Sequence, residues 1–249
     1  MNLSNSARPT EVLLDVQGLH VAYGKAEVVH GASLQVRAGE FVVLLGRNGA
    51  GKSSLLHAIS GLIPKRRGRV VFAGQDLSQA SAREMVHAGV IQVLEGHRVF
   101  QQLSVEDNLL IGTYARAPRG DRRLLEQAYD LFPEMADKRH QMASRLSGGQ
   151  QQILAVAQGV VGQPRLLILD EPSSGLAPMV IDRILEVASG LCRQGVAILL
   201  VEQLVDKALR HAHHGYLMET GRITADDSAT ALRTSDLIHR VYLGQAHHE

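Results

Sequence analysis

The sequence predicts an α/β fold, because apolar strand-like runs alternate with glycine loops and helical patterns along the chain. The run FVVLL at 41–45 is wholly apolar, which is typical of a strand buried on both faces of a parallel sheet. It leads through a glycine-rich loop into SSLLHAISGL, where apolar residues recur at helical spacing. RLLILD at 165–170 and VAILLVE at 196–202 repeat this arrangement, since a helical pattern follows each buried run.

A single folded unit, from 11 to 244, accounts for the order of these elements. Residues 1–10 are polar, and we expect a flexible N-terminus there. Strand-like runs follow at 12–16 and 28–36. From about 81 to 162 the chain is richer in charge and in helical patterns, with no linker of glycine and proline to set it apart. We interpret this segment as a helical subdomain inserted into the same unit.

Local signals mark the ends of two helices and one hairpin. Ser104, followed three residues later by Asp107, resembles a helix N-cap arrangement. Pro178 suits the first position of a helix, where its missing N–H is not needed, and an apolar stripe follows it. The segment GYLMETGRI predicts a hairpin that turns at Thr220 and Gly221.

Composition and charge exclude several classes of protein. Of the 249 residues 45% are hydrophobic, which is not the composition of a disordered or fibrous chain. The formal net charge of +1 argues against a general nucleic-acid coat or a polybasic membrane anchor. The single cysteine, Cys192, excludes an internal disulfide and is expected in the core. Because the chain shows neither a secretory signal nor a membrane-spanning stretch, we expect it to be soluble when isolated.

A glycine-rich loop after the 41–45 run matches G-x-x-x-x-G-K-[ST], the pattern that binds nucleotide phosphates. Its glycines let backbone N–H groups curl around phosphate oxygens, and the following helix adds unpaired donors and a partial positive charge. Lys52 is expected to reach the β- and γ-phosphates, and the Ser53 hydroxyl to ligate Mg²⁺. The alternative is a plain glycine turn, but the flanking strand and helix favour a nucleotide site. The loop comprises Gly46, Arg47, Asn48, Gly49, Ala50, Gly51, Lys52 and Ser53.

Two carboxylates, Asp170 and Glu171, follow the buried run that starts at 165. Ligands collect at the carboxyl ends of strands in open α/β sheets. Asp170 would therefore hold Mg²⁺, directly or through water, as the strand acid of P-loop NTPases does. Glu171 would take a proton from the attacking water. The alternative, a charged strand end with one helix cap, is disfavoured by the phosphate loop upstream.

A second glycine-rich segment, LSGGQ, opens a helix ahead of Asp170 and forms an anion cradle that has no lysine. Here the sequence resembles the ATP-binding-cassette (ABC) ATPases, whose signature LSGGQ lies between the phosphate loop and the acidic strand. The resemblance extends from Leu13 to Gly244 and implies a P-loop NTPase fold with an inserted helical subdomain and an N-terminal antiparallel β-subdomain. The signature residues are Leu146, Ser147, Gly148, Gly149 and Gln150.

The resemblance also implies how ATP and Mg²⁺ are bound. In the family two such domains dimerise head to tail, and each ATP lies between one phosphate loop and the LSGGQ of the partner. Ser147, Gly148 and Gly149 would thus contact the γ-phosphate bound by the other subunit. Tyr23 matches the aromatic residue that stacks on adenine, with a core or edge tyrosine as the alternative. The predicted ATP-binding residues are Tyr23, Gly46, Arg47, Asn48, Gly49, Ala50, Gly51, Lys52, Ser53 and Ser54.

Further segments resemble one branch of the family, the ATPases of branched-chain amino acid importers and of related urea and amide importers. They are LEGHRVF at 94–100, SGLAP at 174–178, VEQ at 201–203, ETGRI at 219–223 and the ending VYLG, and they match the shorter of the two ATPases that such systems pair. The resemblance implies membrane permease subunits as partners, an indirect link to a periplasmic or extracellular solute-binding protein, and a peripheral location at the cytoplasmic face of the membrane. It leaves open the solute and whether the ATPase dimer is homomeric or heteromeric.

Two positions depart from the general family pattern and resemble the pattern of this branch. Glu95 stands where most members have a glutamine that meets Mg²⁺ and the attacking water. Gln203 stands where most have a histidine that contacts the γ-phosphate, and an amide can donate a hydrogen bond but carries no positive charge. The predicted metal ligands are thus Ser53, Glu95 and Asp170, and the predicted catalytic residues are Glu171 and Gln203.

The alternative function is an ABC ATPase that acts on nucleic acid or ribosomes. Such proteins carry two cassettes or a long coiled coil, whereas this chain has one cassette, no heptads and a net charge of +1. The histidines at 211, 213, 214, 247 and 248 have poor spacing for a metal site, so we expect solvated surface or a tag-like tail. The basic run at 65–67 is expected to be a solvated loop, with phosphate or nucleic-acid contact as the alternative.

Overall fold

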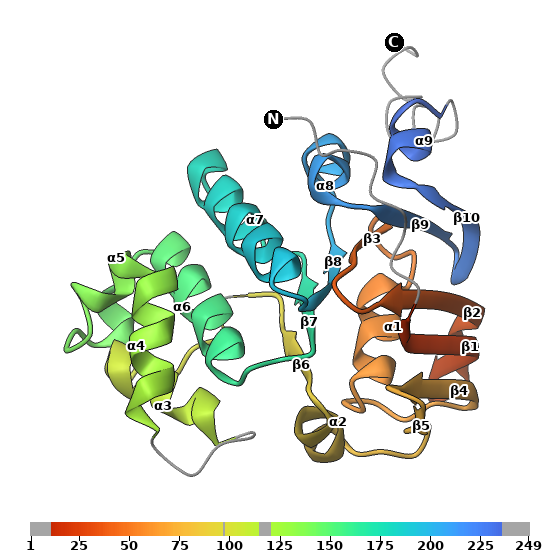
Figure 1. Cartoon of the computed structure of the whole chain (residues 1–249). Coiled ribbons are helices and arrows are strands. Elements are labelled where there is room, and N and C mark those ends of the chain that lie inside the picture. The colour runs from red at the N-terminus through yellow and green to blue at the C-terminus, as the bar shows by residue number, and fades with distance from the viewer. Residues whose placement is uncertain (1–10, 97, 115–120, 236–249) are drawn as a thin grey trace.

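The computed structural model describes residues 11–96, 98–114 and 121–235 of the chain. The predicted flexible segment 1–10, the VYLG segment, the terminal histidines and the end of the predicted 11–244 unit lie outside these residues. The described chain forms two sheets with helices between and beside them (Figure 1), which confirms the predicted α/β class.

The larger sheet has six strands in the order β10-β9-β3-β8-β7-β6. Its strands from β9 to β6 are parallel, and only β10 runs antiparallel, as the partner of β9. The predicted buried runs are the three central strands, and the predicted turn at Thr220 and Gly221 joins β9 to β10. The strands are β3 (Phe41–Leu45), β6 (Val90–Val93), β7 (Leu166–Asp170), β8 (Ala197–Val201), β9 (His214–Glu219) and β10 (Arg222–Ser228).

The smaller sheet has four antiparallel strands in the order β2-β1-β4-β5 and is the predicted N-terminal β-subdomain. Strands β1 and β2 are longer than the predicted runs. Buried residues alternate with partly exposed ones over much of their length, so no continuous apolar run marks their full extent. The strands are β1 (Val12–Tyr23), β2 (Ala26–Arg37), β4 (Arg67–Phe72) and β5 (Gln75–Asp76).

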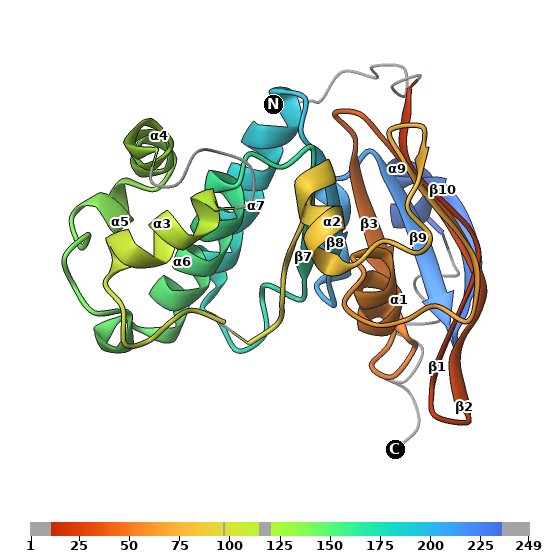
Figure 2. The same ribbon diagram turned by 90° about the horizontal axis from the view of Figure 1, so that it is seen from below.

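Helix α1 lies between the two sheets, where it contacts β1, β2 and β7 (Figure 2). Helices α6 and α7 lie against the opposite face of the larger sheet, and α8 and α9 pack beside β3 and β9. In the part of the chain that the structure describes, no helix combines the length and the apolar character needed to cross a membrane. The bounds are α1 (Lys52–Ile59), α2 (Ala82–Ala88), α6 (Gly148–Val161), α7 (Pro178–Arg193), α8 (Val205–His211) and α9 (Ala229–Arg233).

The helical subdomain is an excursion between strands β6 and β7 (Figure 1). Its predicted start at 81 is wrong, because α2 precedes β6 and β6 pairs with β7 as the edge strand of the larger sheet. The four residues VIQV form too short a run to stand out among neighbouring helical patterns. The excursion contains α3 (Val105–Thr113), α4 (Arg122–Leu131), α5 (Pro133–Ala136), the 3-10 turn η1 (Ala143–Arg145) and the start of α6.

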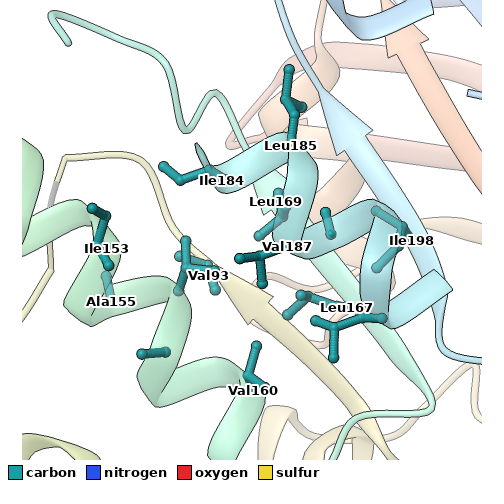
Figure 3. Close-up of a cluster of buried hydrophobic side chains, with 14 of the residues drawn as sticks. Val93, Ile153, Ala155, Val160, Leu167, Leu169, Ile184, Leu185, Val187 and Ile198 are labelled. Atoms are coloured by element: carbon teal, nitrogen blue, oxygen red, sulfur yellow. The ribbon is translucent and has the colours of Figure 1, made fainter. Parts of the chain in front are cut away.

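The core has two parts, one on each face of the larger sheet, because successive strand residues point to opposite faces. On β7, Leu167 and Leu169 join the cluster under α6 and α7, whereas Leu166 and Ile168 join the cluster between the sheets. Figure 3 shows the first cluster, in which side chains of α6 and α7 meet those of β6, β7 and β8. The carboxyl ends of the strands are thereby held in fixed positions relative to one another.

The predicted helix ends are confirmed at both positions. The Ser104 hydroxyl accepts a hydrogen bond from the Asp107 backbone N–H at 3.0 Å and caps α3. Pro178 is the first residue of α7.

The predicted solvated surface holds for His213, which is exposed, but not for His214, which is buried, and His211 is partly buried. His211 Nδ1 lies 2.8 Å from the Ser189 hydroxyl, and the Phe41 backbone N–H donates to the ring of His213 at 2.9 Å. His214 is buried, with its Nε2 bonded to Asp226. The sequence spacing does not reveal these environments. His211 ends α8 and His214 begins β9, so the three side chains contact different neighbours. Cys192 is buried in the core, as predicted.

Candidate nucleotide site

The phosphate loop is the turn at 46–51 between β3 and α1. Gly46 has a φ of 155°, and a Cβ at this position would lie 2.3 Å from the carbonyl oxygen of Met218. Gly51 has a φ of 101° and caps α1, and a Cβ there would lie 2.8 Å from the Val28 carbonyl oxygen. Both positions therefore require glycine, and the loop lies tightly between β2 and β9.

Lys52 is buried, and its ammonium group bends back over the phosphate loop. Its Nζ donates to the carbonyl oxygens of Gly46 at 2.8 Å and Arg47 at 3.2 Å. The same nitrogen lies 3.2 Å from Oε1 of Glu171, where it forms an ion pair. The pair brings the lysine of the loop and the acid after β7 together at the carboxyl edge of the sheet, where ligands collect in open α/β folds.

Asp170 ends β7 and is only 2% exposed. The Ser53 hydroxyl donates to its Oδ1 at 3.1 Å, and His57 Nε2 lies 3.6 Å from its Oδ2. The sequence analysis missed His57, although the signal was present. On α1 it lies one turn after Ser53, and residues four apart on a helix are neighbours.

The pKa of Asp170 is raised to about 6, mainly by burial. The negative charges of Glu171 and Glu95 add to the rise, and the Ser53 hydrogen bond and the charge of Lys52 oppose it. Glu95 itself is exposed in the loop that follows β6. The Ser53 and Asp170 oxygens are hard donors of the kind that Mg²⁺ takes beside phosphate oxygens and water. Within the described ranges, no three His, Cys, Asp or Glu side chains form a metal cage of their own.

The raised pKa of Asp170 predicts that Asp170→Asn stabilises the fold at high pH. Protonation favours the native state, so the ionised carboxylate contributes no penalty below about pH 4, a growing one up to the folded pKa near 6, and the full one above. A rise from 3.8 to about 6 corresponds to about 3 kcal/mol. Urea unfolding in the presence of EDTA should show a gain approaching this size at pH 8 and little gain at pH 4.

The matched control for this experiment is Asp130→Asn, on the exposed face of α4. It should leave the free energy of unfolding within about 0.5 kcal/mol at both pH values. A gain for Asp170→Asn that is equal at pH 4 and pH 8 would contradict the assigned cause.

Glu171 and Gln203 meet directly. Gln203 Nε2 donates to Glu171 Oε2 at 2.5 Å, while Lys52 contacts the other oxygen of the same carboxylate. Glu171 has a φ of 44°, a conformation that non-glycine residues adopt at a cost, and its backbone N–H donates to the Val201 carbonyl oxygen at 3.0 Å. The backbone therefore turns sharply after β7 and holds the carboxylate between two donors.

Tyr23 ends β1 and is 52% exposed, which excludes the alternative of a core tyrosine. Its hydroxyl lies 3.3 Å from the Ser54 hydroxyl on the first turn of α1. The ring thus borders the phosphate loop and keeps much of its surface open for stacking.

The signature segment lies elsewhere in the molecule. Ser147 caps α6: its hydroxyl accepts from the Gln150 N–H at 3.3 Å, and the Gln150 side chain accepts from the Ser147 N–H at 3.0 Å. A Cβ at Gly149 would lie 2.9 Å from Val180 in the first turn of α7, and Leu146 is buried in the subdomain core. Figures 1 and 2 show α1 on one side of β7 and α6 on the other. The phosphate loop and the signature segment of one chain therefore do not lie together.

Sequence analysis also missed Glu202, the residue after β8. Its carboxylate is buried beside the loop that follows Glu171 and accepts hydrogen bonds from Ser173. The VEQ segment contains Glu202, but nothing local shows that its carboxylate is buried, because its partner Ser173 lies 29 residues away.

Comparison with known proteins gives consistent matches. The family model described as "ABC transporter" matches residues 29–174. The branched-chain amino acid transport ATP-binding protein BraG of Pseudomonas aeruginosa is 37% identical over 93% of this chain and 100% of its own. A probable LivF protein of Archaeoglobus fulgidus, also named for branched-chain amino acid transport, is 30% identical over 91% of this chain and 96% of its own. The lipopolysaccharide export ATP-binding protein LptB of Escherichia coli K12 is 28% identical over 93% of this chain and 97% of its own.

Solved structures share the fold. The ADP conformation of the ATP-binding cassette MJ1267 aligns with a TM-score of 0.83 at 24% identity, over 95% of this chain and 100% of that one. The cassette MJ0796, solved as a dimer, aligns with a TM-score of 0.77 at 21% identity, over 87% of this chain and 99% of that one.

Proposed function

This chain belongs to the ABC transporter family, and from that membership we propose that it energises the uptake of branched-chain amino acids through separate membrane permease subunits. The family makes it an ATP-binding and ATP-hydrolysing subunit. The observation that carries the catalytic assignment is the Glu171 carboxylate, held between Lys52 and Gln203 at the end of β7.

The phosphate loop would bind the ATP phosphates through its backbone N–H groups and the Lys52 ammonium. Ser53 and Asp170, with Glu95 near them, would hold Mg²⁺, which neutralises phosphate charge when bound. Glu171 would accept the proton of the attacking water. Gln203, which reaches Glu171 through a neutral amide, would orient that water or the γ-phosphate by hydrogen bonding alone.

The position of α6 supports a dimeric active site. Ser147, Gly148 and Gly149 lie on the other side of β7 from α1, so they would bind the γ-phosphate held by a second ATPase subunit. The cradle is built from a capped helix N-terminus, which attracts anions through its unpaired N–H groups.

The solute assignment rests on the match to BraG over that protein's whole length. The segments LEGHRVF, SGLAP, VEQ and ETGRI favour the shorter ATPase of a pair, from a system for branched-chain amino acids or for urea and amides. The helical subdomain would press on the permeases from the cytoplasmic face of the membrane, and a solute-binding protein would deliver the cargo on the far side.

Transport by a reconstituted complex tests this function. The chain would be combined with the permease subunits of a branched-chain amino acid importer, in proteoliposomes that also receive the solute-binding protein. We expect leucine uptake that requires both this chain and ATP, and none in liposomes that lack the chain. Urea uptake without leucine uptake would overturn the solute assignment. ATPase activity that DNA or RNA stimulates in a salt-sensitive manner would overturn the transport assignment in favour of the nucleic-acid alternative.

A further inference from the structure

A buried carboxylate lies behind the catalytic residues. Glu202 follows β8 directly and is 1% exposed. Its carboxylate accepts hydrogen bonds from the Ser173 N–H at 3.1 Å, the Ser173 hydroxyl at 2.6 Å and the Gln203 N–H at 3.1 Å. A longer contact of 3.5 Å comes from the Leu204 N–H.

Burying a carboxylate is strongly unfavourable unless hydrogen bonds satisfy it. Burial raises the pKa of Glu202, and the bonds from Ser173, Gln203 and Leu204 oppose that effect. Within the described part of the chain, no lysine, arginine or histidine nitrogen forms an ion pair with Glu202. Four neutral donors from two separate loops therefore hold this carboxylate, so its position is tied to the position of both loops.

Those two loops carry the proposed catalytic groups. Ser173 lies two residues after Glu171, and Gln203 is the next residue after Glu202. Gln203 and Glu171 in turn touch each other through their side chains. Glu202 thus closes a ring of contacts: its carboxylate joins the backbones of the loops, and the Gln203–Glu171 bond joins their functional ends.

We propose that Glu202 is a positioning residue that fixes Glu171 and Gln203 relative to each other for ATP hydrolysis. The proposal rests on the proposed function and deepens it. Glutamine cannot replace Glu202, because in either orientation its amide nitrogen would face a backbone N–H, that of Ser173 or that of Gln203, and leave donors opposed. Aspartate is shorter by one methylene and would not reach both loops.

The test is the steady-state ATPase activity of Glu202→Gln. A small displacement of reacting groups lowers kcat by about 10- to 100-fold, while the KM for ATP should stay within about three-fold, because the phosphate loop is untouched. Glu40→Gln is the matched control. Glu40 is equally buried, its carboxylate accepts from the Arg37 N–H at 2.8 Å, and it precedes β3 at the end of the sheet away from the phosphate loop.

A structural role alone would lower the thermal stability of both variants without a selective loss of kcat in Glu202→Gln. Equal kcat for the two variants at matched folded concentration would overturn the proposal. Ser173→Ala is the second variant and keeps the test decisive if Glu202→Gln does not fold. Because it removes one donor and leaves the three backbone bonds, we expect a smaller loss of kcat, about 3- to 10-fold. No loss in this variant would count against the proposal.

A double-mutant cycle on kcat separates positioning from simple destabilisation of the fold. If Glu202 acts by placing Gln203, Glu202→Gln should lower kcat less in a Gln203→Ala background than in the wild type. Fully additive losses would overturn the proposal. If the wild-type chain neither binds nor hydrolyses ATP, the proposed function itself fails, and that outcome is distinct from either result for Glu202.

Discussion

Glu171→Gln is expected to lower kcat for ATP hydrolysis by about 10²- to 10⁴-fold while ATP binding persists. Glutamine keeps the size of the side chain but cannot accept a proton from water. The loss of charge also ends the ion pair with Lys52, whose Nζ lies 3.2 Å from the carboxylate, and frees that ammonium for phosphate. The ATP affinity should therefore be unchanged or higher. Single-turnover hydrolysis and equilibrium binding of a fluorescent ATP analogue measure the two effects separately.

Glu126→Gln on the exposed side of α4 is the matched control and should retain full turnover. Proposed head-to-tail assembly adds a second readout. Because the variant binds ATP without cleaving it, it should accumulate as an ATP-bound dimer in size-exclusion chromatography. Turnover within ten-fold of the wild type would show that another group activates the water.

Lys52→Ala is expected to weaken the binding of ATP strongly. The Lys52 ammonium is buried against the Gly46 and Arg47 carbonyl oxygens and supplies a positive charge inside the phosphate loop. Hydrogen bonds to a charged group contribute about 1.5–3 kcal/mol each, so removing this one should raise the Kd for ATP by roughly 100-fold. Isothermal titration calorimetry with ATP and Mg²⁺ measures the change.

Lys207→Ala is the control for charge removal. Its ammonium pairs with Asp182 at the surface, where an ion pair contributes little, so the Kd should not change. The melting temperatures of both variants show whether a fall in affinity reflects unfolding. Wild-type affinity in a folded Lys52→Ala protein would exclude the loop as the phosphate site.

The residues that sequence analysis placed correctly lie in short, contiguous patterns. The phosphate loop needs only its own glycines and the neighbouring strand and helix, and the structure shows that Gly46 and Gly51 are required by close backbone contacts. The position of Asp170 and Glu171 at the carboxyl end of a buried strand was predicted, whereas the ion pair between Lys52 and Glu171 was not. The last hairpin was predictable from its turn residues, whereas the antiparallel sheet was implied by the family resemblance and not by local signals.

What sequence analysis missed depends on partners that are distant in the chain. The sequence of β6 resembles the helical segment around it, and only its pairing with β7 defines it as a strand. His214 looks like a surface residue until Asp226 of the adjoining strand reaches its ring. Glu202 would be an ordinary charged strand end if Ser173 did not fold back onto it. In each case tertiary contact, and not local propensity, decides the environment of the side chain.

Helices α1 and α6 lie on opposite sides of β7. Under the proposed function, each chain therefore contributes its phosphate loop to one ATP site and its signature segment to another. A subunit with an inactivated phosphate loop would still supply its signature segment to a partner subunit whose phosphate loop is intact. Two differently damaged copies could then complement one another in a mixed pair, with one intact centre restored. Because only the dimer would hydrolyse ATP, the ATPase rate in dilute solution would rise with the square of the protein concentration.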